Sequence, residues 1–87
     1  MQDKPKIDYP CAYPIKVMGE HNDEFESVIV EIIQRHDPGL NSETISLRAS
    51  RTGRYVSLNV TITATGPEQI QALFDDLKAS GRVAMVL

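Results

Sequence analysis

The segment Tyr55–Ala64 alternates polar and apolar residues without interruption. Its apolar members are Val56, Leu58, Val60, Ile62 and Ala64. Its polar members are Tyr55, Ser57, Asn59, Thr61 and Thr63. A period of two is typical of a strand whose successive side chains point to opposite faces of a sheet. The chain is therefore predicted to contain a sheet with one buried face and one polar face, and the polar face offers hydroxyls and an amide rather than catalytic groups.

Length and composition indicate one small globular domain. The chain has 87 residues, of which 41% are apolar and 24% charged, as is ordinary for a folded protein. A net charge of −3 argues against a dedicated nucleic-acid binder.

The single cysteine, Cys11, excludes an internal disulfide and fits a reducing compartment. The first ten residues contain no apolar signal core, and no stretch approaches the roughly 20 apolar residues that span a bilayer. A cytoplasmic protein without membrane contact is expected.

The first half of the domain is predicted to be a strand followed by a helix. Residues 1–10 are polar, contain two prolines and are interpreted as a loose arm, so that the single domain covers residues 11–87. The strand is expected over Cys11–Met18 and ends at Gly19. The helix is expected to start near Asn22, a good N-cap. It stops at Asp37-Pro38-Gly39, because the residue before a proline disfavours the α region. The apolar stripe of this helix consists of Phe25, Val28, Ile29, Ile32, Ile33 and His36.

A hairpin is predicted next. The strand Glu43–Ser50 should point Ile45, Leu47 and Ala49 inward. Opposite residues of an antiparallel pair share a face. The pairs predicted on that basis are Ser50 with Tyr55, Arg48 with Ser57, Ser46 with Asn59, Ala49 with Val56, Leu47 with Leu58 and Ile45 with Val60. This register calls for a four-residue loop or a bulge over residues 51–54, with Gly53 at positive φ.

The second helix is predicted to start at Thr65-Gly66-Pro67-Glu68, where Thr65 and Glu68 have capping-box spacing and Pro67 suits the first turn. Gly81 is the expected C′ residue. A last strand, Arg82–Leu87, should place Val83, Met85 and Leu87 on one face.

The order β-α-β-β-α-β predicts an α+β ferredoxin-like fold, a four-stranded antiparallel sheet of order 4-1-3-2 with both helices on one face. The open face should display Lys16, Met18, Thr44, Ser46, Arg48, Tyr55, Ser57, Asn59, Thr61, Thr63, Arg82, Ala84 and Val86.

The sequence is compatible with three interpretations of this open face: a solvated sheet face, a contact surface for another protein or a second copy of the chain, and an RNA-binding face. RNA-recognition motifs of this fold stack bases on aromatic residues of the central strands, where this chain offers only Tyr55 and Met18. Arg48, Arg51 and Arg54 also gather at the hairpin tip. They are interpreted either as solvated charges or as a contact for an anion or an acidic partner. The candidate interaction surface consists of Lys16, Arg48, Arg51, Arg54, Tyr55, Ser57 and Asn59.

No catalytic or metal constellation is found in the sequence. His21 and His36 lie at opposite ends of the first helix, and neither has a ligand at metal-binding spacing. Asp75 and Asp76 are about 100° apart on a helix and do not form a carboxylate pair. No phosphate loop or nucleotide fingerprint is present. Neither a metal nor a cofactor is expected, and the chain is predicted not to be an enzyme.

The chain resembles the small, uncharacterised YbeD-like proteins of proteobacteria. The resemblance rests on four runs: Tyr13–Gly19, Val30–Gly39, Arg51–Ala64 and Val83–Leu87. The resemblance covers about Tyr9 to Leu87. It implies a fold similar to the ACT regulatory domain, a module that pairs into dimers and often senses amino acids in metabolic enzymes. In ACT domains the ligand loop follows the first strand, which here corresponds to Gly19, Glu20, His21 and Asn22.

Backbone N–H groups before a helix can hold an anion, but Asp23, Glu24 and Glu26 oppose that use of the loop. The leading hypothesis is a non-enzymatic, regulatory bacterial module that acts by contact with an unknown protein partner or by sensing a small metabolite, with a homodimer possible. The alternative is RNA binding through the hairpin arginines and the open sheet face.

Overall fold

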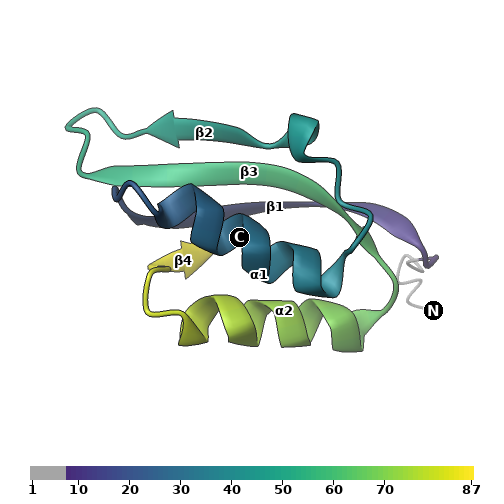
Figure 1. Ribbon diagram of the computed structural model, residues 1–87. Helices are drawn as coiled ribbons and strands as arrows, with labels where there is room; N and C mark the ends of the chain where they lie inside the picture. The colour runs from purple at the N-terminus through teal and green to yellow at the C-terminus, as the bar shows by residue number, and fades with distance from the viewer. Residues whose placement is uncertain (1–7) are drawn as a thin grey trace, which may run out of the picture.

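The computed structural model describes residues 8–87. Its elements are β1 (Cys11–Glu20), α1 (Phe25–His36), the short 3-10 helix η1 (Ser42–Thr44), β2 (Ser46–Ala49), β3 (Tyr55–Ala64), α2 (Pro67–Ala79) and β4 (Met85–Val86). They form one antiparallel sheet of order β2-β3-β1-β4, with both helices on one side (Figure 1). Read from the other edge, this is the predicted order 4-1-3-2, so the ferredoxin-like fold is confirmed. Of the expected arm, residues 1–7 lie outside the described part.

The two long central strands hold the core. β1 and β3 pair over ten residues each, from Cys11 opposite Ala64 to Glu20 opposite Tyr55. The predicted apolar sides of both strands face the helices, and Val17 and Leu58 are fully buried there. The fully buried side chains with the largest volumes are Phe25, Ile29, Ile33, Leu58, Ile62, Leu73, Leu77 and Val17. Burial of this size supplies most of the stability of a small domain.

β1 does not end at Gly19 as expected but continues to Glu20. A Cβ atom built on Gly19 would overlap the backbone oxygen of Arg82 and lie 2.7 Å from Cε1 of Phe25. The absence of a side chain therefore allows close packing of β1 against the segment before β4 and against α1, rather than stopping the strand.

Both helices end where predicted, but their starts differ in detail. α1 begins at Phe25 rather than near Asn22, although the Asn22 Oδ1 atom accepts a hydrogen bond from the Glu24 N–H at 2.8 Å. At α2 the capping box expected between Thr65 and Glu68 is wrong. The Thr65 N–H instead donates to the Oε1 atom of Gln69 at 2.8 Å, because Gln69 faces the strand end while Glu68 is exposed.

The edge strand β2 is shorter than the predicted Glu43–Ser50, because residues 42–44 form η1. The register of Ser46, Leu47, Arg48 and Ala49 against β3 is confirmed, as is the positive φ of 76° at Gly53. The expected burial of Leu47 and Ala49 is wrong, since both are exposed and Leu47 retains 44% of its accessible surface. Neither α1 nor α2 covers this edge of the sheet, so a side chain of β2 that points toward the helical side stays exposed (Figure 1).

The edge strand β4 is reduced to Met85–Val86, and its predicted face assignment is wrong. Val86 pairs with the buried Val17 and packs against the core, whereas Met85 pairs with Met18 on the open face. Val83 also packs against the core. Two core contacts three residues apart break the period of two, so the segment before Met85 is irregular. Within residues 8–87, neither helix has the length and apolar character that a bilayer crossing requires.

Candidate functional site

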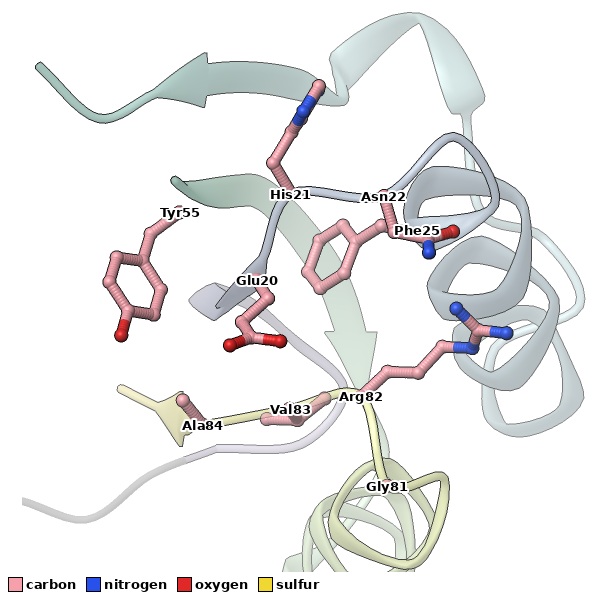
Figure 2. A pocket seen from close by; sticks show the side chains of 9 residues that line it. All are labelled: Glu20, His21, Asn22, Phe25, Tyr55, Gly81, Arg82, Val83 and Ala84. Atoms are coloured by element: carbon pink, nitrogen blue, oxygen red, sulfur yellow. The ribbon is translucent and has the colours of Figure 1, made fainter. Parts of the chain in front are cut away.

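A pocket of about 410 Å³ opens at the end of the domain where β1 finishes and α1 begins. It is lined by Glu20, His21, Asn22, Phe25, Tyr55, Gly81, Arg82, Val83 and Ala84. We call it the corner pocket. Its walls come from the end of β1, the first turn of α1, the start of β3 and the irregular segment after α2, so segments far apart in the sequence meet there (Figures 1 and 2).

The fold fixes the walls of the corner pocket. Glu20 lies opposite Tyr55 in the last register pair of β1 and β3. The loop that follows is held by a backbone hydrogen bond of 2.8 Å from the His21 N–H to the Arg54 carbonyl oxygen. Gly81, at φ 75°, turns the chain out of α2, a conformation that favours glycine. The Ala84 N–H then donates to the Met18 carbonyl oxygen at 2.7 Å, which ties the next wall to β1.

The corner pocket combines charges of both signs with aromatic surface. Figure 2 shows the Glu20 carboxylate and the Phe25 ring directed into the pocket, with the Tyr55 ring beside them. The His21 ring points away from it. The Arg82 guanidinium extends toward α1, where its Nη2 atom donates to the Glu24 carboxylate at 3.1 Å. Both side chains are solvent-accessible, at 34% for Arg82 and 70% for Glu24, and exposed pairs of this kind contribute little to stability. Arg82 can therefore be drawn to another anion.

The structure brings most of the predicted ligand loop to this pocket. Glu20, His21 and Asn22 all line it, whereas Gly19 is buried beneath it inside β1. Tyr55, predicted as part of the sheet surface, lines the pocket as well. Arg82 was expected on the open face of a strand; it lies instead in the irregular segment before β4, which is why sequence reasoning missed its place in the pocket.

The other residues of the predicted interaction surface lie outside the corner pocket. Lys16, Arg48, Ser57 and Asn59 are on the open sheet face, where the Ser57 hydroxyl donates to the Arg48 carbonyl oxygen at 3.4 Å. Arg51 and Arg54 lie in the hairpin loop, and the Arg54 guanidinium sits 5.6 Å from the centre of the Tyr55 ring, within cation–π range. The structure therefore distributes the predicted interaction surface over the corner pocket, the open sheet face and the hairpin loop.

At the opposite end of the helical layer, which we call the closed end, side chains join α1, α2 and β3. The buried Asp37 accepts a hydrogen bond through Oδ2 from the Thr63 N–H at 2.9 Å. The Gln69 amide donates to the carbonyl oxygens of His36 and Thr63 at 2.7 and 3.1 Å. His36 Nε2 lies 2.6 Å from Oδ2 of Asp76. Sequence reasoning missed this cluster, although the His36 position at the edge of the apolar stripe gave a partial signal.

Metal chemistry finds no support in the described side chains. Across residues 8–87, no group of three or more histidines, cysteines or carboxylates comes together in a way that could hold a metal ion. Cys11 is a free, half-buried thiol at the start of β1. The arrangement is suited to binding a small polar molecule in the corner pocket.

A family model described as "protein of unknown function (DUF493)" matches residues 4–87. A relative described as a UPF0250 protein, from Azotobacter vinelandii, is 57% identical over 84 residues, covering 95% of this chain and 91% of its own. A second UPF0250 protein, from Pseudomonas aeruginosa, is 54% identical, with 95% and 90% covered.

Solved structures share the fold at low sequence identity. The solution structure of protein HP0495 from H. pylori superposes with a TM-score of 0.74 at 21% identity, covering 97% of this chain and 88% of that one. The crystal structure of the ACT domain from the GTP pyrophosphokinase of Chlorobium tepidum gives a TM-score of 0.67 at 22% identity, covering 88% and 97%. At such identities the likeness shows an ACT-like fold alone.

Proposed function

The chain belongs to the DUF493 family of small proteobacterial proteins, and we propose that it is a non-enzymatic regulatory module that senses a small zwitterion, such as an amino acid, in the corner pocket. One observation carries the proposal. Glu20 and Arg82, two residues of opposite charge, line the same pocket as Tyr55 and Phe25.

The ammonium group of the ligand is assigned to the Glu20 side of the pocket. A carboxylate attracts an ammonium group through a charge-assisted hydrogen bond. The neighbouring Tyr55 ring, opposite Glu20 in the strand register, adds a cation–π contribution. The ligand carboxylate is assigned to Arg82, whose present partner Glu24 is mostly exposed and is therefore a weak competitor.

The ligand side chain is assigned to the partly exposed apolar surface of Val83, which lines the pocket above the buried Phe25 ring. A pocket of about 410 Å³ lies within the range of small-molecule sites. The ACT-like fold supports a regulatory role by analogy.

The test is a calorimetric titration of the purified protein with each of the twenty amino acids. At least one should bind with a Kd below about 1 mM, equivalent to about −4.1 kcal/mol. The variant Glu20→Gln should weaken that binding about tenfold or more, since it removes the charge that faces the ammonium group. The matched control Glu68→Gln, in the exposed first turn of α2, should leave the affinity unchanged. Failure of the whole panel, or equal affinity in Glu20→Gln, contradicts the proposal.

A further inference from the structure

The open face of the sheet is ordered in rows that cross the strands. One row consists of Arg48, Ser57, Met18 and Met85, as the strand registers place them side by side. The next row consists of Ser46, Asn59, Lys16 and Leu87. Leu87 joins this row because its backbone exchanges hydrogen bonds of 3.0 and 2.9 Å with Lys16. No element of residues 8–87 covers these rows, because both helices lie on the other side of the sheet (Figure 1).

An apolar patch occupies the β1–β4 side of this face. Met18 and Met85 are direct cross-strand neighbours, and Leu87 follows in the next row. Met85 is 51% and Leu87 65% exposed. Adjacent exposed apolar residues of this kind mark contact sites for other molecules. Methionine side chains are flexible and polarisable, so they adapt to the apolar side chains of a protein segment.

Four cations lie on or beside the open face, against one strand carboxylate, Glu20, which shares that face with Lys16 and Met18. Lys16 and Arg48 lie in the two rows themselves, and Arg51 and Arg54 are in the adjoining hairpin loop. Among the side chains of strands β1 to β4, Glu20 is the only carboxylate. Seven acids lie instead on α1, α2 and the loop before α1, namely Asp23, Glu24, Glu26, Glu31, Glu68, Asp75 and Asp76, and Glu43 lies in η1 before β2. The domain is thus negative on its helical side and positive on its open sheet, despite a net charge of −3.

We propose that the open sheet face docks an acidic, amphipathic segment of a partner protein. Apolar side chains of the segment pack on Met18, Met85 and Leu87, while its carboxylates pair with Lys16 and Arg48. Complementary charge speeds association and rejects partners of the same sign. Single-stranded RNA is the less favoured occupant, because bases need several aromatic platforms and Tyr55 is the sole aromatic residue on this face between residues 11 and 87.

The test uses two synthetic helical peptides. Both carry leucines on one face; the other face carries glutamates in the first peptide and lysines in the second. Binding to the ¹³C-methyl-methionine-labelled protein is followed by NMR at moderate salt. The acidic peptide should shift the Met18 and Met85 methyl signals, and the basic peptide should not bind.

Variants of the same face make the test specific. The double variant Lys16→Glu/Arg48→Glu should raise the Kd of the acidic peptide about tenfold or more, and Met85→Gln should weaken binding through the lost apolar contact. Lys78→Glu, an equal charge change per residue on exposed α2, is the control and should change the Kd less than about twofold, as expected for a charge outside the contact. An amide spectrum of each variant verifies the fold.

Three outcomes would overturn the inference: equal binding of the acidic and basic peptides, equal losses in Lys78→Glu and the sheet-face variants, or tighter binding of a uridine oligonucleotide than of the acidic peptide. The last would assign the face to nucleic acid. Glu20→Gln should not weaken peptide binding, so the result is independent of the corner pocket.

Discussion

The two ends of the helical layer are built in opposite ways. At the closed end, Asp37, Gln69 and His36 join α1 to α2 and to the end of β3 through hydrogen bonds of 2.6 to 3.1 Å. At the pocket end, the exposed ion pair Arg82–Glu24 links the segment after α2 to the start of α1. Polar groups at the closed end satisfy one another within the fold, whereas the ion pair at the pocket end is open to solvent and weakly held.

The closed end is therefore expected to be rigid, and the pocket end is expected to respond to a ligand. Leaving the buried Asp37 carboxylate without its hydrogen bond would be costly, so the closed end should hold the helices in a fixed position. Local stability is lower where links are few and exposed. A ligand that bridges Glu20 and Arg82 would therefore act on the end of the domain that is easiest to rearrange.

The largest effect is expected from Asp37→Ala at the closed end. Asp37 is 8% exposed and accepts a hydrogen bond from the Thr63 N–H, and hydrogen bonds to charged groups contribute about 1.5–3 kcal/mol. The free energy of unfolding, measured by urea denaturation, should fall by about that amount. Asp37→Asn keeps an acceptor oxygen in the same place and should lose less. Equal losses in the two variants would show that the hydrogen bond is not what holds this end.

The next effect concerns Gly19→Ala beneath the pocket. The new methyl group would overlap the Arg82 backbone oxygen and the Phe25 ring, and overpacking of this kind costs about 1–3 kcal/mol. Because the displaced atoms belong to the pocket walls, amino-acid binding should weaken together with stability.

The control for that variant is Gly39→Ala, whose new methyl group meets nothing closer than 3.9 Å. It should change the free energy of unfolding by no more than about 0.5 kcal/mol. If Gly19→Ala were as mild as this control, the close packing of β1 against the pocket wall would be refuted.

The central part of the fold could be predicted from the sequence because its pattern is regular. The alternation of Tyr55–Ala64 located β3, and the face parity set its register against β2. The edges could not be predicted in the same way. Leu47 pairs with the fully buried Leu58 yet is 44% exposed, since burial there depends on which strand the helices cover. At β4, Val83 and Val86 both face the core, and no alternation signals that irregular path.

Of the candidate site, only the segment that follows the first strand could be predicted from the sequence. The end of β1 and the loop after it place Glu20, His21 and Asn22 at the pocket. Arg82 is 62 positions from Glu20 in the sequence, and its place depends on the turn at Gly81 and the late start of β4. The closed end was missed for a related reason. The Asp37-Pro38-Gly39 stop explains Asp37 locally, and its bond to Thr63 arises only when the strands and helices pack.

The smallest effect is expected from Glu24→Gln at the pocket end. The pair with Arg82 is exposed, so its loss should cost no more than about 1 kcal/mol of stability. Arg82 would then be free for the ligand carboxylate, and the affinity for the amino acid should rise by at most about fivefold. A calorimetric titration of this variant beside the unaltered protein measures the change. A clear drop in affinity would mean that Glu24 itself contacts the ligand.

Amide hydrogen exchange, recorded with and without the amino acid that binds, tests the contrast between the two ends most directly. The amides of Thr63 and Asp37 should exchange slowly in both states. The pocket amides of His21 and Ala84 should exchange faster in the free protein and slow down when the ligand is added. Equal protection at both ends in the free protein, or ligand protection confined to the closed end, would refute the proposed difference between the two ends.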